Sequence, residues 1–242
     1  MELNCDMGEA FGIYDFGADA ELMPHITLAN VACGYHGGDP VVIRETVRLA
    51  RSHGVRVGAH PSYPDRQGFG RRAMAMEREE LAAALIYQVG ALKGFLDAEG
   101  MALSHLKPHG ALYGVAARDE SVAHAVADAA EAFGVPVMGM AATLHETVYR
   151  ERGLEFLAEY YADLEYDDEG GLIITRKHVA YDPAEAAARV ARVMREGVAV
   201  SAGGRELPMR ADCVCVHSDT PGAAAVAAAV AEVLRGGGDG AA

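Results

Sequence analysis

The stretch TLANVACGYHGGDPVVIRETVRLARSHGVRVGAH, residues 27–60, contains one complete strand–helix–strand unit. Its apolar run Thr27–Ala32 predicts a buried strand. The pair Asp39-Pro40 then supplies an N-cap followed by proline at the first helical position, and Gly54 ends the helix. A second apolar run, Val55–His60, follows at once. Two strands joined by a helix run parallel in one sheet, so this stretch predicts an α/β fold on a parallel sheet.

The same alternation of short apolar runs and longer helical patterns continues along the chain. A further helix is predicted from about Glu77 to Glu99, where leucines recur at helical spacing. Two segments depart from the rhythm: a long loop at 61–76, and an excursion at about 160–181 with a short hairpin near Asp167–Gly171. We therefore expect one barrel domain over residues 1–242, with a flexible tail at 236–242. The predicted strands are Glu2–Asp6, Thr27–Ala32, Val55–His60, Leu103–Lys107, Val135–Met140, Leu154–Glu159 and Cys213–His217.

Composition limits the class of partner. The net charge of −14 argues against nucleic acid and against an anionic membrane surface. No uninterrupted apolar stretch has the length of a membrane span, and the chain starts without a signal peptide, so we expect a cytoplasmic protein. The four cysteines, none in a CxxC pair, are interpreted as small buried apolar residues in a reducing compartment.

Polar side chains gather at the carboxyl ends of the predicted strands. In a β/α barrel these ends meet at one mouth, where catalytic sites lie, and buried charges are costly unless they are paired or used. The pattern therefore predicts an enzyme. The residues in these positions are Asn4, Asp6, Asn30, His36, Asp39, His60, His105, Lys107, His109, His217 and Asp219.

Several of these residues also have plainer interpretations. Asp39 can serve only as a helix N-cap, and His60 can be a satisfied histidine at a strand end. His105 and His124 are interpreted as packing or surface histidines. Lys107 is harder to explain in this way, because a lysine between apolar neighbours is desolvated unless a carboxylate such as Asp6 or Glu9 pairs with it. The loop residues Asp65, Arg66, Arg71 and Arg72 can be a solvated charged surface.

Four blocks of sequence carry a resemblance to one family. NCDMGE at 4–9 resembles an NxDxGE element, and ANVACGYHGGDP at 29–40 resembles ANxACGFHxGDP. GAHPSYPDR at 58–66 with GFGRR at 68–72 resembles GAHPSxPDRxxFGRR, and KPHGALY at 107–113 is identical to a fourth element. Together, in this order and spacing over residues 1–115, the blocks resemble the LamB/YcsF family.

The resemblance implies a (β/α)7 TIM-like barrel related to glycoside hydrolases and polysaccharide deacetylases. It implies ATP-dependent opening of the 5-oxo-L-proline lactam to L-glutamate, carried out together with 5-oxoprolinase subunits B and C. The P-loop pattern GxxxxGK[ST] is absent from the chain, so ATP chemistry is expected to need those partners. The family blocks also add Glu9 and Tyr113 to the expected substrate-binding residues.

The second half of the chain departs from the family pattern. A family ADRxY element reads Ala162-Asp163-Leu164-Glu165-Tyr166, and the usual HGD near the C-terminus reads His217-Ser218-Asp219. An arginine can bind a carboxylate with two parallel hydrogen bonds. With Leu164 in its place, the sequence does not specify which lactam is the substrate, although Arg176 lies nearby in the sequence.

Lactam hydrolysis needs an activated water, charge stabilisation at the oxyanion and a proton for the leaving amine. We expect Asp6 or His60 to act as general base, and Lys107 with His36 or His109 to stabilise the oxyanion or a phosphorylated substrate. Asn4 and Asn30 would orient the amide, while Arg66, Arg71 or Arg72 would hold a carboxylate.

Two other hypotheses remain open at the level of sequence. One is a metal-dependent hydrolase acting alone, with Asp6, His60 and His109 as candidate ligands of a divalent metal. The other is a non-catalytic subunit that binds substrate and delivers it to its partners.

Overall fold

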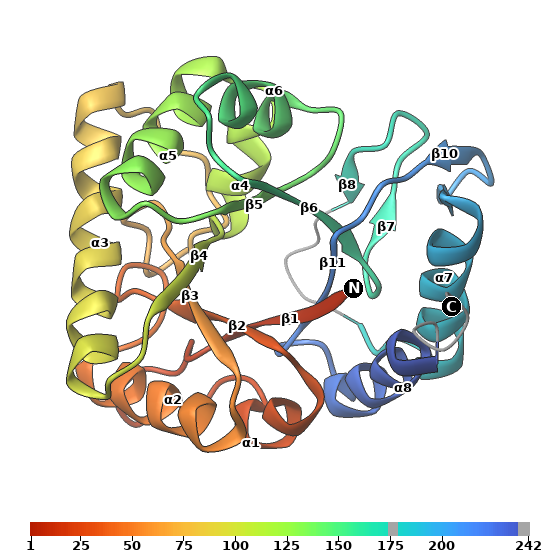
Figure 1. The fold of residues 1–242 in the computed structure, drawn as a ribbon, viewed down its shortest axis with the longest axis horizontal. Coiled ribbons are helices and arrows are strands. Elements are labelled where there is room, and N and C mark those ends of the chain that lie inside the picture. The colour runs from red at the N-terminus through yellow and green to blue at the C-terminus, as the bar shows by residue number, and fades with distance from the viewer. Residues whose placement is uncertain (174–178, 237–242) are drawn as a thin grey trace.

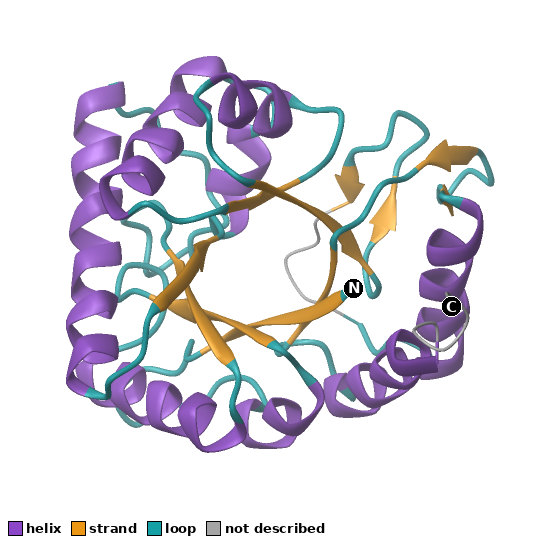
Figure 2. Ribbon diagram, in the orientation of Figure 1, coloured by secondary structure: helices purple, strands orange, loops and turns teal. Residues whose placement is uncertain are grey.

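The fold is a closed barrel of parallel strands. The computed structural model describes residues 1–173 and 179–236, and in this part of the chain seven strands close in the order β1-β11-β6-β5-β4-β3-β2, with every neighbouring pair parallel. Figure 1 looks through the ring of strands, and Figure 2 shows helices around its outside. The predicted (β/α)7 barrel is confirmed. Its strands are β1 (Glu2–Met7), β2 (Leu28–Ala32), β3 (Arg56–His60), β4 (Leu103–Leu106), β5 (Val137–Gly139), β6 (Phe156–Tyr161) and β11 (Cys213–His217).

Helix α2 (Pro40–His53), which connects β2 to β3, begins and ends where the sequence predicts. The Asp39 carboxylate accepts from the backbone N–H groups of Val41 and Val42, and Gly54 takes the left-handed conformation that ends the helix. The helices are α1 (Asp19–Leu22), the 3-10 turn η1 (Met23–His25), α2 (Pro40–His53), α3 (Arg78–Ala98), α4 (Gly110–Ala116), α5 (Glu120–Phe133), α6 (Leu144–Glu151), α7 (Pro183–Glu196) and α8 (Ala223–Gly236).

Helix α3 is long and apolar enough to cross a membrane by length and composition alone. Its apolar side, including Leu81, Leu85, Val89 and Leu92, is buried in the barrel core. Core helices of this kind pass the same test, so the helix is weak evidence for a membrane span.

The excursion between β6 and α7 contains the predicted hairpin, formed by β7 (Glu165–Tyr166) and β8 (Leu172–Ile173). A second hairpin, β9 (Val198–Val200) with β10 (Glu206–Pro208), was not predicted, because three-residue strands carry almost no periodic signal. Arg176 and the tail from 237 onwards lie outside the described residues.

Strand β6 begins two residues later than predicted, and this shift matters for the site. Gly153 has a positive φ of 75°, and the Leu154 N–H still bonds to Tyr149 at the end of α6, so these residues finish the helix. The strand consequently runs to Tyr161. It carries Glu159 into the barrel and Tyr161 to the mouth.

The barrel interior is unusually polar. The register sets Asp6 of β1 beside Asn30 of β2 on one side and His217 of β11 on the other. Lys107, directly after β4, reaches into the same space, and all four side chains are buried. Polar groups buried this deeply need partners, so the interior must be one connected network.

Candidate active site

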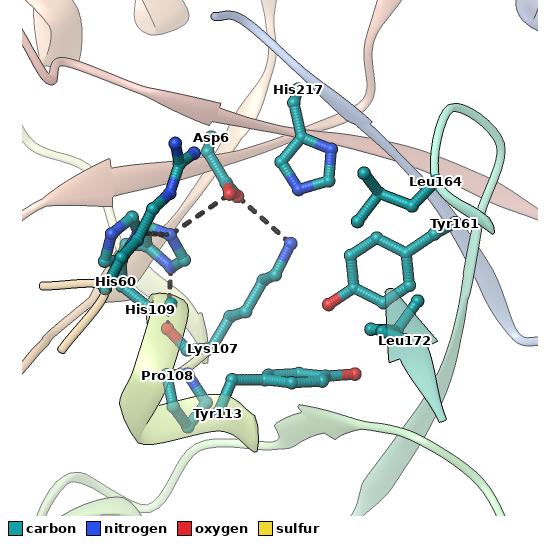
Figure 3. Close-up of a pocket in the computed structure, with 12 residues that line it drawn as sticks. Asp6, His60, Lys107, Pro108, His109, Tyr113, Tyr161, Leu164, Leu172 and His217 are labelled. Atoms are coloured by element: carbon teal, nitrogen blue, oxygen red, sulfur yellow. Dashed lines mark hydrogen bonds and ion pairs between the residues drawn. The ribbon is translucent and has the colours of Figure 1, made fainter. Parts of the chain in front are cut away.

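A pocket opens at the carboxyl ends of the barrel strands (Figure 3), the position of catalytic sites in this architecture. It holds about 430 Å³ of empty space, counted out to its open mouth. It is lined by Asp6, His60, Arg71, Lys107, Pro108, His109, Gly110, Tyr113, Tyr161, Leu164, Leu172 and His217.

Lys107 is the cation at the base of the pocket. Its Nζ lies 3.0 Å from Asp6 Oδ1 and 2.9 Å from Glu159 Oε1, and the residue is only 2% exposed. Burial alone would lower the pKa of Lys107, but Asp6, with Cys215 and Glu159, raises it well above its usual range. The ammonium is therefore charged. Of the two partners suggested by the sequence, Asp6 is in contact, and Glu159 takes the second position.

Asp6 links Lys107 to two histidines. Its Oδ2 lies 3.2 Å from His60 Nε2, and His60 Nε2 lies 3.0 Å from His109 Nδ1. Burial would raise the pKa of Asp6, but His60 and Lys107 hold it well below its usual range. Asp6 is thus an ionised carboxylate at neutral pH, in contact with an ammonium on one oxygen and an imidazole on the other.

Glu9 and His36 form the next part of the network. His36 Nε2 lies 3.0 Å from Glu9 Oε1, and His109 Nδ1 lies 3.5 Å from the same oxygen. The two loops approach closely at Gly37, where an added Cβ would lie 2.7 Å from the Glu9 carbonyl oxygen. Burial lowers the pKa of both histidines well below the usual range, so both rings are neutral.

His217 lines the opposite side of the pocket and is held by Asp163. The Asp163 carboxylate accepts from the His217 backbone N–H at 2.8 Å and lies 2.9 Å from its Nδ1. Burial would lower the pKa of His217, but the Asp163 charge and hydrogen bond raise it. The His217 ring lines the pocket wall, so in its protonated form it can donate a proton there.

The remaining wall is aromatic and apolar. Tyr113 of α4 and Tyr161 of β6 meet edge to face with ring centroids 5.9 Å apart. Leu164 and Leu172, on either side of the β7–β8 hairpin turn, complete this wall. Leu164, the position where the family pattern has arginine, therefore faces the pocket directly.

The residues below the pocket orient the charged groups. Asn30 Nδ2 donates to Asn4 Oδ1 and to Asp6 Oδ1, each at 2.8 Å, and His105 Nε2 lies 2.7 Å from Asn30 Oδ1. His105 is fully buried in this polar network, as expected of a packing histidine and not of a surface one. It fits there because Gly58 opposite has no side chain; a Cβ at that position would overlap the His105 ring.

The loop arginines and Asp39 have different partners in the structure, and only Arg71 among them lines the pocket. Arg71 lines the pocket and pairs with Asp219 at 2.8 Å, whereas Arg72 pairs with Asp65 within the loop. Arg66 is exposed, donates to the Gly34 carbonyl and stacks on Phe11, 3.8 Å from its ring centroid. Asp39 caps α2 with one oxygen and accepts from the Gly12 N–H with the other. Neither Arg66 nor Asp39 lines the pocket.

Sequence reasoning missed three residues of this site: Glu159, Asp163 and Tyr161. The signal for Glu159 was a lone acidic residue inside an apolar strand. The signal for Asp163 was its place in the ADRxY-like element, directly before Leu164. Tyr161 was assigned to the excursion because the end of β6 was set two residues too early.

Glu9, His36, His60 and His109 could together hold a metal ion, because one ligand atom from each lies within 4.8 Å of the others. All four are buried. Imidazole and carboxylate are the donors that zinc and related divalent metals take in hydrolases.

The chain is similar to known proteins over almost its whole length. The model of the LamB/YcsF family matches residues 1–239. The "lactam utilization protein lamB" of Emericella nidulans is 48% identical over 91% of this chain and 88% of its own length. The A subunit of 5-oxoprolinase from Chloroflexus aggregans is 47% identical over 98% of this chain and 96% of its own length.

A solved structure agrees with the fold and the alignment. The crystal structure of the lactam utilization protein from Thermus thermophilus superposes with a TM-score of 0.89 at 43% identity, and the match covers 98% of this chain and 97% of that one. Each of these relatives is matched over nearly its whole length. The chain belongs to the LamB/YcsF family.

Proposed function

We propose that this chain is the A subunit of an ATP-dependent 5-oxoprolinase, opening the lactam of 5-oxo-L-proline to L-glutamate in the cytoplasm together with subunits B and C. The observation that carries the proposal is the buried Asp6–Lys107 pair, with His60 on one side and His217 on the other, at the mouth of the barrel. Two of the similar proteins carry names that refer to 5-oxoprolinase or to lactam utilization over the same length of chain.

The charges in the pocket suit hydrolysis of an amide. Asp6 or His60, which lie 3.2 Å apart, would take a proton from the attacking water. The Lys107 ammonium would stabilise negative charge that develops on the lactam oxygen. The opened ring leaves as an amine, which needs a proton, and His217, whose pKa is raised by Asp163, would supply it from that wall.

The pocket walls would hold the ring itself. Tyr113, Tyr161, Leu164 and Leu172 form an apolar surface against which the methylene groups of a five-membered lactam can pack. Arg71, which lines the pocket, would hold the substrate carboxylate and exchange part of its pairing with Asp219 for it.

ATP would be used jointly with the partner subunits, since the chain has no P-loop sequence. The test is reconstitution of this chain with the B and C subunits of the same organism. Glutamate and ADP should form together from 5-oxoproline, and omission of any one component should stop both. A complete complex that hydrolyses ATP but leaves 5-oxoproline and a panel of other lactams intact would contradict the proposal.

A second candidate is a metal-dependent amidohydrolase or deacetylase that works without partners. The group of Glu9, His36, His60 and His109 favours it. Activity of the isolated chain on simple amides and lactams, lost on chelation and restored by metal, would support this candidate over the first.

A further inference from the structure

His60 and His109 each turn one ring nitrogen toward the other, and this arrangement suits a cation bound by both rings. His60 Nδ1 lies 2.8 Å from the Lys107 carbonyl oxygen, and His109 Nε2 lies 2.7 Å from the Phe69 carbonyl oxygen. A carbonyl only accepts, so each of these nitrogens must carry the ring proton. The second nitrogens of the two rings, His60 Nε2 and His109 Nδ1, are thus the positions at which a neutral ring presents a lone pair, and they lie 3.0 Å apart.

Carboxylate oxygens crowd the same point. Asp6 Oδ2 lies 3.2 Å from His60 Nε2, and Glu9 Oε1 lies 3.5 Å from His109 Nδ1. Two ring nitrogens and two carboxyl oxygens thus converge on one point. A proton can be shared by only two of these atoms, whereas a divalent cation can bind several of them at once.

The spacing suits direct coordination. Two ligand atoms each about 2.1 Å from a tetrahedral metal lie roughly 3.4 Å apart, close to the 3.0 Å and 3.5 Å separations here. Ligating histidines in proteins usually donate their other ring N–H to a carbonyl or a carboxylate. His60 and His109 both do so already, through Lys107 and Phe69.

His36 takes a different place. Its ring stacks on His109 with centroids 3.7 Å apart and planes inclined by only 2°. The lone pairs of two stacked rings lie in parallel planes, so these two rings are poorly placed to share one ion. His36 instead donates from Nε2 to Glu9 Oε1 at 3.0 Å, which orients that carboxylate.

We propose that Glu9, His60 and His109 bind one divalent transition-metal ion at the edge of the pocket, with His36 orienting Glu9 and an open coordination position facing the substrate. This set differs from the one suggested by the sequence, because the ligand atoms that lie within 4.8 Å of one another include Glu9 and not Asp6, whose Oδ1 pairs with Lys107. A metal there would act as a Lewis acid toward a carbonyl or a water. The inference does not depend on which amide is hydrolysed.

The test uses metal content and spectra, independent of turnover. The full chain is stripped with a chelator, dialysed, and titrated with Co²⁺ and with Zn²⁺. We expect one equivalent of metal to bind per chain and Co²⁺ to give visible d–d absorption. The melting temperature should rise with metal concentration, as expected for a ligand that binds only the folded chain.

Variants locate the ion. Glu9→Gln and His60→Gln should lose stoichiometric binding while circular dichroism shows a folded chain. His36→Gln should still bind but about 10–100-fold more weakly, as expected for a residue that only orients a ligand. His124→Gln, a partly exposed histidine on α5, is the matched control and should bind as the parent does.

Two results would overturn the assignment. The first is a parent chain that takes up less than about 0.1 equivalent of either metal under conditions where structural sites fill. The second is full uptake by Glu9→Gln, because that variant keeps the shape of the side chain and removes only its charge. If His60→Gln fails to fold, Glu9→Gln alone decides the outcome.

Discussion

Replacement of Lys107 by methionine should destabilise the barrel by about 3–5 kcal/mol, the usual cost of breaking a buried ion pair. The ammonium lies 3.0 Å from Asp6 Oδ1 and 2.9 Å from Glu159 Oε1. At an effective dielectric constant of about 20, each contact is worth roughly 5–6 kcal/mol of gross attraction, most of which offsets the desolvation of the charges. Methionine fills the space but leaves two buried carboxylates without a cation.

This destabilisation should depend on pH in a definite direction. In the parent chain the folded pKa of Asp6 lies below its unfolded value, so its contribution is present above about pH 4 and is lost on further acidification. The pKa of Lys107 is raised, so its contribution persists up to about pH 10 and is lost as pH rises through the folded value. The difference between parent and variant should therefore be greatest between about pH 5 and 9 and shrink below about pH 4.

The assay is urea unfolding followed by circular dichroism at several pH values. Lys93→Met is the matched control, since Lys93 pairs with Asp97 at 2.7 Å on the exposed face of α3, and the change should cost less than about 1 kcal/mol. Adding Glu159→Gln to Lys107→Met should restore part of the loss, because one unpaired charge disappears. A Lys107→Met chain as stable as the Lys93→Met chain at pH 7 would refute the reasoning.

Three further changes test other parts of the site. Asp163→Asn should lower the pKa of His217, measured by NMR titration of its ring, and shift the alkaline limb of the kcat/KM profile to lower pH. Leu164→Arg should increase the preference for 5-oxoproline over the uncharged 2-pyrrolidinone, measured as a ratio of kcat/KM values. Gly58→Ala should destabilise the fold by about 1–3 kcal/mol in urea unfolding, because its Cβ would meet the His105 ring.

Each of these changes has its own control. For Asp163→Asn, an unchanged His217 titration would mean that the carboxylate does not set its charge. For Leu164→Arg, a Leu164→Met variant keeps the apolar wall and should leave the ratio unaltered. For Gly58→Ala, Gly90→Ala in α3 meets only Phe133 at 3.8 Å and should be neutral or stabilising, so equal losses in both variants would contradict the steric argument.

The barrel could be predicted from sequence because its signals are local. Capping at Asp39 and Gly54 and the apolar runs between turns identify each βα unit without knowledge of its neighbours. The sequence indicates where the network around Lys107 lies, but not which residues pair within it. Which carboxylate meets an ammonium depends on strand stagger around the closed barrel, and in this barrel Glu159 of β6, and not Glu9, lies 2.9 Å from Lys107 Nζ.

The replacement of arginine by Leu164 in the ADRxY-like element also has a physical explanation in the positions of the side chains. Asp163 holds His217, and the Tyr166 hydroxyl accepts from the Tyr161 N–H at 3.0 Å, so two of the retained residues of the ADRxY-like element serve the scaffold of the pocket. Leu164, the changed residue between them, faces the space where substrate would lie. Changing a side chain that only faces the pocket alters the wall at no cost to the network behind it. We therefore expect differences in ring preference among relatives to follow position 164, while the acid at His217 and the pair at Lys107 stay the same.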